Sequence, residues 1–122
     1  MLLEINELSV RYGKSVKALQ GSSLTVAEGE LVSLIGQNGA GKSTLLKAII
    51  GLVPIHSGSI RYQGRSVAEK KFSIIQNRIA YVPEDRGIFS SLSVAENMQI
   101  GAVSRKDRKA VQGDIAREVE RF

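Results

Sequence analysis

The clearest chemical signal in the chain is a run of glycines that ends in a lysine and a serine. The run matches the pattern G-x-x-x-x-G-K-[ST] at every position and reads Gly36-Gln37-Asn38-Gly39-Ala40-Gly41-Lys42-Ser43. Glycines let the backbone turn tightly, so that successive N–H groups point into one concavity and hold phosphate oxygens. In such a loop the lysine reaches the β- and γ-phosphates, and the serine hydroxyl ligates Mg²⁺. The run therefore predicts a triphosphate-binding loop in which Lys42 supplies charge and Ser43 holds the metal.

The residues on either side of this loop fit the elements that must position it. Residues 31–35 form an apolar run, which predicts a buried parallel strand. Residues 44–50 predict a helix, and Gly51 suits its end. A strand, a loop and a helix in this order place phosphates at a helix N-terminus, where free N–H groups and the helix dipole favour anions. The alternative is a glycine-rich turn that matches the pattern by chance.

Short strands are expected in four further places, at residues 3–12, 18–26, 59–64 and 79–83. In the first of these, apolar and polar residues alternate as in a half-buried strand, with an irregularity near Glu7. A turn at residues 12–15 joins it to the second, which predicts an N-terminal antiparallel pair.

Two serines have the spacing of helix capping boxes. Ser93 with Glu96 predicts a helix to about residue 101, and Ser104 with Asp107 predicts a second helix that reaches the last residue. Val111, Ile115, Val119 and Phe122 form one apolar stripe along this second helix. Residues 65–77 have no clear period, and a short helix is one interpretation.

Composition limits the classes of protein that the chain can belong to. Its length of 122 residues suits one domain or a large part of one, and its hydrophobic content of 43% is typical of a globular protein. It has no cysteine, no apolar run long enough to cross a bilayer and no basic segment before its first apolar residues, so we expect a cytosolic protein without disulfides or a signal peptide. The net charge is +5, but basic residues are mixed with acidic ones, and nucleic-acid binding is not expected.

Several motifs occur together in a specific order. They are Tyr12, residues 37–44, Gly51-Leu52, Ser57-Gly58-Ser59-Ile60, Tyr81-Val82-Pro83-Glu84 and residues 92–97. This order, over essentially the whole chain, resembles the nucleotide-binding subunit of an ABC transporter. The resemblance implies an α/β fold, a P-loop NTPase of ABC type with N-terminal antiparallel strands and part of a parallel core sheet. Residues 1–122 would be the N-terminal part of one ABC nucleotide-binding domain.

The resemblance also assigns roles to matching residues, with ATP and Mg²⁺ as cofactors. Tyr12 would stack on adenine, an interaction that any base accepts. Ser43 and Glu84 would hold Mg²⁺, although the family usually has glutamine at the position of Glu84. The alternatives are that Tyr12 shields a strand end and that Glu84 is a surface acid. The residues implied to hold the triphosphate are Gly36, Asn38, Gly39, Ala40, Gly41, Lys42, Ser43 and Thr44.

Residues 81–89 narrow the resemblance. Glu84 in place of glutamine, followed by Arg86 and the pair Ile88-Phe89, is similar to the shorter ATPase of branched-chain amino-acid importers, and importers of urea or other amides share the pattern. The implied function is to bind MgATP and energise uptake. The implied partners are transmembrane permease subunits, a second ATPase subunit and, indirectly, a substrate receptor; no nucleic acid is implied. The implied location of the chain is the cytoplasmic face of the inner membrane.

Three motifs that the family uses for hydrolysis are missing from the sequence. It contains no Leu-Ser-Gly-Gly-Gln signature, no apolar strand that ends in Asp-Glu and no later switch histidine, since His56 precedes that position. Residues 79–85 imitate the Asp-Glu strand, but the acids are reversed and Pro83 is unsuited to a central strand. We therefore expect a chain truncated before these motifs, with no catalytic residues, no ATPase activity by itself and marginal folding, because residues 31–35 would have unpaired edges.

Other functions stay open at this point. A complete small P-loop NTPase would have to use Asp85 as its Mg²⁺ residue. A nucleotide-binding regulatory module would bind without hydrolysis. A non-transport ABC ATPase of the translation or repair type is a further alternative.

Overall fold

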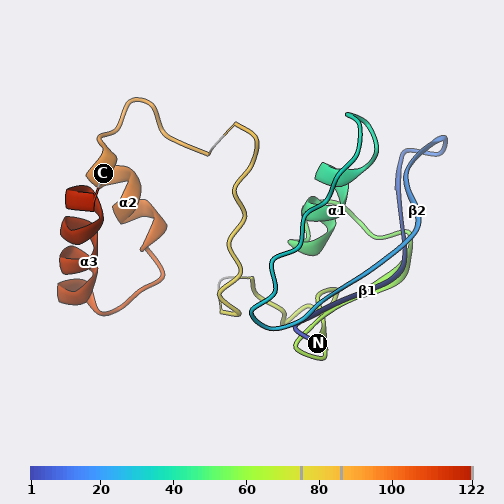
Figure 1. Ribbon diagram of the computed structural model, residues 1–122, viewed down its shortest axis with the longest axis horizontal. Coiled ribbons are helices and arrows are strands. Elements are labelled where there is room, and N and C mark those ends of the chain that lie inside the picture. The colour runs from blue at the N-terminus through green and yellow to red at the C-terminus, as the bar shows by residue number, and fades with distance from the viewer. Residues whose placement is uncertain (75, 86, 122) are drawn as a thin grey trace. The chain divides into compact units, whose positions relative to one another are not determined.

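The computed structural model describes residues 1–74, 76–85 and 87–121. These residues divide into two compact units, Met1–Tyr81 and Val82–Phe122, and each is considered by itself. The first unit contains β1 (Leu3–Tyr12), β2 (Val16–Val26), α1 (Lys42–Ile49), β3 (Ser57–Tyr62) and β4 (Arg65–Ser66), and the second contains α2 (Val94–Gly101) and α3 (Arg108–Arg121) (Figure 1). No helix in the described ranges is both long and apolar enough to cross a membrane.

The four strands form one antiparallel sheet in the order β2-β1-β3-β4, which confirms the predicted N-terminal pair. The irregularity predicted near Glu7 is a break in the register of β1 against both neighbours. Glu7 has a φ of +46°, and its N–H donates to Ser23 Oγ at 2.9 Å. Strand β3 approaches this point closely, because a Cβ on Gly58 would lie 2.4 Å from the Glu7 carbonyl oxygen. Only glycine fits between the two strands there.

Helix α1 packs on the sheet and closes the hydrophobic core of the first unit. Leu45 and Ala48 of the helix are buried against apolar side chains of the strands, which are Ile5, Leu8, Val10, Leu19 and Ile60. The helix ends at Ile49, close to the end predicted by Gly51, and the Gly51 N–H donates to the Ala48 carbonyl. Apolar burial at these positions fixes where the helix begins and ends on the sheet.

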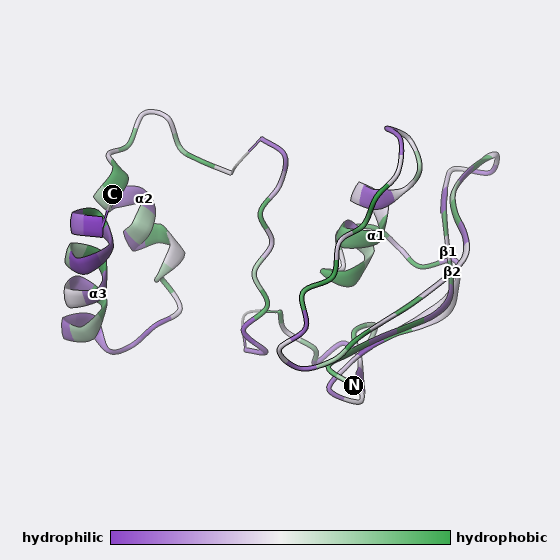
Figure 2. Cartoon of the chain, in the orientation of Figure 1, coloured by the Kyte–Doolittle hydropathy of each residue, from purple (hydrophilic) through white to green (hydrophobic). Residues whose placement is uncertain are grey.

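Two predicted strands do not form. Within the part of the chain that the structure describes, neither residues 31–35 nor residues 79–83 form a strand. The strands that do form pair only antiparallel, so the parallel part of the predicted sheet is not present in these residues. A strand needs a hydrogen-bonded neighbouring strand, and none of the described residues pairs with either segment. Leu31 and Ile35 are 94% and 96% exposed, and Figure 2 shows that the segment leading into α1 is hydrophobic.

The interpretation of residues 65–77 as a short helix is wrong for those that the structure covers. Residues 65 and 66 form β4, which the sequence analysis missed, and turns follow; Ile75 lies outside the described residues. The connection from β3 to β4 consists of Gln63 and Gly64, with φ angles of +49° and +78°. Two successive positive φ angles are typical of a type I′ hairpin turn.

In the second unit, helices α2 and α3 pack side by side (Figure 1). The Ser93–Glu96 capping box is confirmed, because the Glu96 N–H donates to Ser93 Oγ at 3.1 Å and the Ser93 N–H donates to Glu96 Oε2 at 2.7 Å. On α3, Val111 and Ile115 are half-buried and Val119 is exposed, while Phe122, the last member of the predicted stripe, lies outside the described residues.

The second predicted capping box is wrong. Asp107 binds Arg105 at 2.6 Å instead of capping with Ser104, and α3 begins only at Arg108. The same guanidinium contacts Asp114 at 2.7 Å, which ties the loop between the helices to α3. Hydrogen bonds from Arg105 lower the pKa of both carboxyl groups.

The two serines provide a matched test of helix capping. We expect Ser93→Ala to destabilise the first turn of α2 by about 1 kcal/mol, because the Glu96 N–H loses its acceptor. Amide hydrogen exchange at Glu96 should then be about fivefold faster. Ser104→Ala is the control and should leave exchange in α3 unchanged. Equal effects of the two substitutions would show that the assigned helix start is wrong.

Candidate functional site

The predicted phosphate loop is held at the N-terminus of α1. Gly41 is the residue that precedes the helix, with a φ of +99°. One hydrogen bond makes a turn within the loop, from the Ala40 N–H to the Gln37 carbonyl at 3.1 Å, and the bond from the Leu45 N–H to the Gly41 carbonyl at 2.9 Å opens the helix. The glycine-rich motif therefore contains a turn and leads directly into α1, although the strand predicted before it is not formed.

The first turn of α1 offers unpaired donors. Within the described residues, the backbone N–H groups of Lys42, Ser43 and Thr44 have no backbone acceptor, because the residues before α1 are not helical and their carbonyl groups do not complete the helical pattern. No side chain caps the helix, since Gly41 has none. Donors of this kind, together with the positive end of the helix dipole, form an anion-binding position.

The Lys42 side chain lies over the same loop. Its ammonium group donates to the carbonyl oxygens of Gly36 and Gln37, the latter at 3.3 Å. The loop's own carbonyls thus hold the charge close to the free N–H groups of the first helical turn. An anion that enters the loop meets backbone donors from one side and an ammonium group that can turn toward it from another.

Tyr12, at the end of β1, is brought to this helix from 32 residues away. Its hydroxyl lies 3.3 Å from Thr44 Oγ1, and either group can donate. Tyr12 as a whole residue is 43% exposed, so it is accessible at the surface beside the loop. The sequence analysis named both residues as site residues, but the contact between them came only from the structure.

Leu19 is a supporting residue that the sequence analysis did not assign to the site. A Cβ added to Gly41 would lie 2.6 Å from Leu19 Cδ2 and 2.8 Å from the Ala18 carbonyl oxygen, so strand β2 lies directly behind the loop. An apolar hollow of about 220 Å³ adjoins this contact, between Leu19, Leu45 and the exposed residues Leu34 and Ile35. The available signal for Leu19 was that it is an apolar residue within the strand predicted at residues 18–26.

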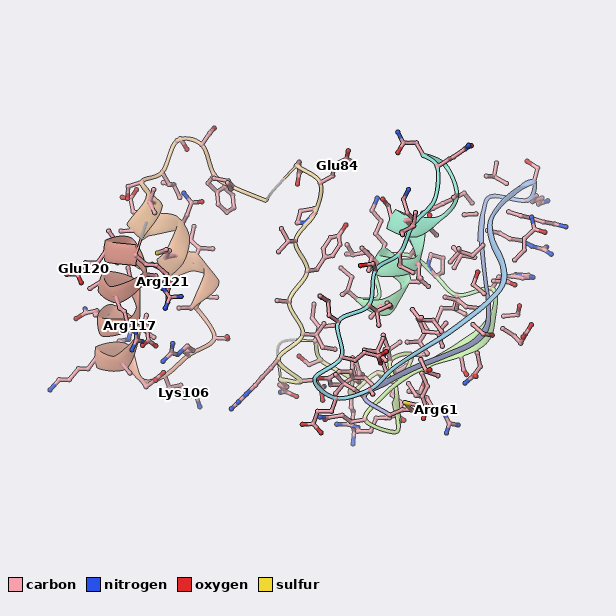
Figure 3. The ribbon with its side chains drawn as sticks, viewed as in Figure 1. Arg61, Glu84, Lys106, Arg117, Glu120 and Arg121 are labelled. Carbon is pink, nitrogen blue, oxygen red and sulfur yellow. The ribbon has the colours of Figure 1, made fainter. Side chains whose placement is uncertain are left out.

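The two predicted Mg²⁺ ligands are not described together. Ser43 is exposed in the first unit, and Glu84 is exposed in the second, on a stretch of chain outside any helix or strand (Figure 3). In the described part of the chain, no three histidine, aspartate or glutamate side chains are placed to share a metal ion. The metal role of Glu84 therefore stays a prediction.

The sequence and this geometry agree with a comparison against protein families. Residues 19–121 match the family model described as ABC transporter, so the chain belongs to this family. Family membership accounts for the glycine-rich loop and for the order of the other motifs.

The most informative relative is an amino-acid transport protein. The high-affinity branched-chain amino acid transport ATP-binding protein BraG of Pseudomonas aeruginosa is 44% identical over 120 residues, covering 97% of this chain and 51% of BraG. The sn-glycerol-3-phosphate import ATP-binding protein UgpC 2 of Rhizobium johnstonii is 36% identical, covering 96% of this chain and 32% of its own length. The phosphonates import ATP-binding protein PhnC of Fusobacterium nucleatum is 35% identical, covering 87% and 44%.

Two solved structures have the same fold. An ATP binding subunit of an ABC transporter has a TM-score of 0.72 and 36% identity, covering 84% of this chain and 42% of its own. The protein cbiO1 of Clostridium perfringens, part of the ABC transporter complex cbiONQ, has a TM-score of 0.76 and 26% identity, covering 98% and 49%. The chain spans about half the length, or less, of these relatives and structures.

Two glycines of the loop differ in what surrounds them, which gives a test of the support from β2. Gly41→Ala should cost about 2–4 kcal/mol of unfolding free energy, because it adds overlap with Leu19 to backbone strain. Gly39→Ala should cost only about 1–2 kcal/mol, since nothing lies within 4 Å of the added Cβ. Denaturant unfolding measures both values, and equal costs would contradict the close contact between Gly41 and β2.

Proposed function

We propose that this chain is the nucleotide-binding part of an ABC importer and binds MgATP to energise uptake of branched-chain amino acids. The observation that carries the proposal is the loop before α1, where the Lys42 ammonium group lies on the loop carbonyls next to an uncapped helix start. These groups together would bind phosphate. Residues 1–122 would form the N-terminal part of one nucleotide-binding domain.

The roles proposed for individual residues follow from this position. The loop residues Gly36, Asn38, Gly39, Ala40 and Gly41 bend the backbone around the phosphates, and Lys42, Ser43 and Thr44 donate to them. Ser43 contributes its hydroxyl to Mg²⁺, and Glu84 contributes a carboxylate oxygen to the ion or to its water. Tyr12, which is accessible at the surface, stacks its ring on adenine.

The branched-chain substrate class rests on two separate supports. BraG is named for branched-chain amino acid transport, and residues 81–89 of this chain carry the glutamate, arginine and Ile-Phe pair of such importers. Other relatives are named for sn-glycerol-3-phosphate and phosphonates, and importers of urea or other amides are the alternative within the pattern. Uptake of labelled leucine and labelled urea, compared in cells with and without the gene, separates these substrates. Loss of urea uptake alone would contradict the proposal.

The assembly that we propose is an importer with two ATPase subunits against transmembrane permease subunits, and a receptor that delivers the substrate. The chain would lie at the cytoplasmic face of the inner membrane. Binding is the step that these 122 residues supply, because electrostatic stabilisation of a transferring phosphoryl group needs several preorganised groups together. Assayed by itself, the chain should bind nucleotide and show negligible ATP hydrolysis, as would a nucleotide-binding module without hydrolysis, the alternative.

Lys42→Ala tests the proposed phosphate contact. We expect MgATP binding to weaken by roughly 1.5–3 kcal/mol, or about 10- to 150-fold, because charge-assisted hydrogen bonds are lost. Lys47→Ala removes the same charge from the last turn of the same helix and should change the affinity little. Calorimetric titration with MgATP measures both variants, and unchanged affinity in Lys42→Ala would exclude the assignment.

Tyr12 is tested by comparing two ligands. Tyr12→Ala should weaken ATP binding by about 1–3 kcal/mol, because adenine loses its stacking partner, but should leave the affinity for inorganic triphosphate unchanged. Tyr12→Phe keeps the ring and loses only the hydroxyl contact with Thr44, so ATP affinity should stay close to that of the wild type. An equal loss for both ligands in Tyr12→Ala would make Tyr12 a structural residue instead.

A further inference from the structure

A second group of positive charges lies at the end of the sheet where β1 turns into β2. Two adjoining hollows, of about 250 Å³ and 360 Å³, share Arg11 and His56 in their walls. Lys17 lines the first hollow, together with the hydroxyl-bearing residues Ser9 and Ser57, and Lys14 lines the second. Among the described residues, no aspartate or glutamate contributes to either wall.

These charges are arranged at an energetic cost. Arg11 and Lys17 are direct cross-strand partners in β1 and β2, and like charges in that relation destabilise a sheet. Among the residues that the structure describes, Arg11, Lys14 and Lys17 form no ion pair, whereas Arg65, Arg105, Arg117 and Arg121 each contact a carboxylate. A bound anion would offset the repulsion between Arg11 and Lys17.

Backbone pairing fixes the shape of the first hollow. The His56 N–H donates to the Ser9 carbonyl at 2.8 Å, and Ser57 is the register partner of Ser9. The segment that carries His56 is thereby held against β1, next to Arg11. Arg11, Lys17, Ser9 and Ser57 all sit on paired strands, so the backbone from which their side chains extend is in place without a ligand.

We propose that this basic hollow, defined by Arg11, Lys17 and His56 with Lys14 at its margin, is a second anion site that binds multivalent phosphate groups. Arginine forms paired hydrogen bonds with phosphate oxygens, lysine adds charge, and the serine hydroxyls and the imidazole add further donors. None of residues 36–44, which form the nucleotide loop, lines either hollow. The phosphate can belong to a soluble anion or to a lipid headgroup, since both present the same oxygens.

The imidazole of His56 provides the probe. Its ring-proton NMR signals, assigned by their loss in His56→Gln, are followed while inorganic pyrophosphate is added to the protein carrying Lys42→Ala, which weakens the nucleotide loop. We expect a saturable shift of these signals. Arg11→Gln combined with Lys17→Gln should weaken the apparent affinity at least tenfold, because two charged donors are lost.

A control with the same change in net charge is available. Lys70→Gln combined with Lys71→Gln removes two positive charges from an exposed turn and should leave the titration unchanged. The Arg11/Lys17 variant should also unfold at a temperature no lower than the parent protein, since it relieves a like-charge pair. No shift with pyrophosphate, or an equal loss in both double variants, overturns the proposal.

Vesicles identify the source of the phosphate. Sedimentation with phosphatidylglycerol vesicles, but not with phosphatidylcholine vesicles, that depends on Arg11 and Lys17 would assign the site to a lipid headgroup. A pyrophosphate titration that depends on the same two residues, without vesicle binding, would assign it to a soluble phosphate. Vesicle binding that survives in the Arg11/Lys17 variant, with no pyrophosphate shift, counts against the site.

Discussion

The docking of α1 on the antiparallel sheet is the interaction on which the first unit depends. Leu45 and Ala48 pack the helix against the strands. Gly41, the residue before the helix, lies directly against β2 because it has no side chain. These contacts fix the start of the helix, and with it the direction of its free N–H groups and the position of Thr44 beside Tyr12. The site is therefore an outcome of helix-to-sheet packing as much as of its own motif.

The features that the sequence predicted correctly are local ones. The helix after Gly41, the irregularity at Glu7 and the Ser93–Glu96 capping box each depend on residues close together in the chain, so their spacing is enough to identify them. The strand predicted at residues 31–35 depends on partners instead, and with none in the described residues its apolar side chains are exposed. The capping box predicted at Ser104 does not form because the Asp107 carboxylate accepts hydrogen bonds from Arg105 instead. Sequence spacing does not reveal this competing ion pair.

The chain distributes its charge differently in its two units. Along α3 and the loop before it, arginines and carboxylates pair within a few residues, so the helix carries its own counter-ions. In the first unit, Lys42 is held by backbone carbonyls and the cations near the β1–β2 turn have no carboxylate in the hollows they line. A protein that leaves cations without internal partners keeps their binding capacity for ligands, at some cost in stability.

The bulge at Glu7 has a geometric consequence for the far end of the same strand. Side chains of a regular strand alternate between its two faces, so Ile5 and Tyr12, seven positions apart, would point to opposite faces. The extra residue reverses the parity: Ile5 lies inward before the bulge, Leu8 and Val10 lie inward after it, and Tyr12 reaches the helix side of the sheet. One added or deleted residue anywhere between Glu7 and Tyr12 would turn the tyrosine away from α1, while a change of two would restore it.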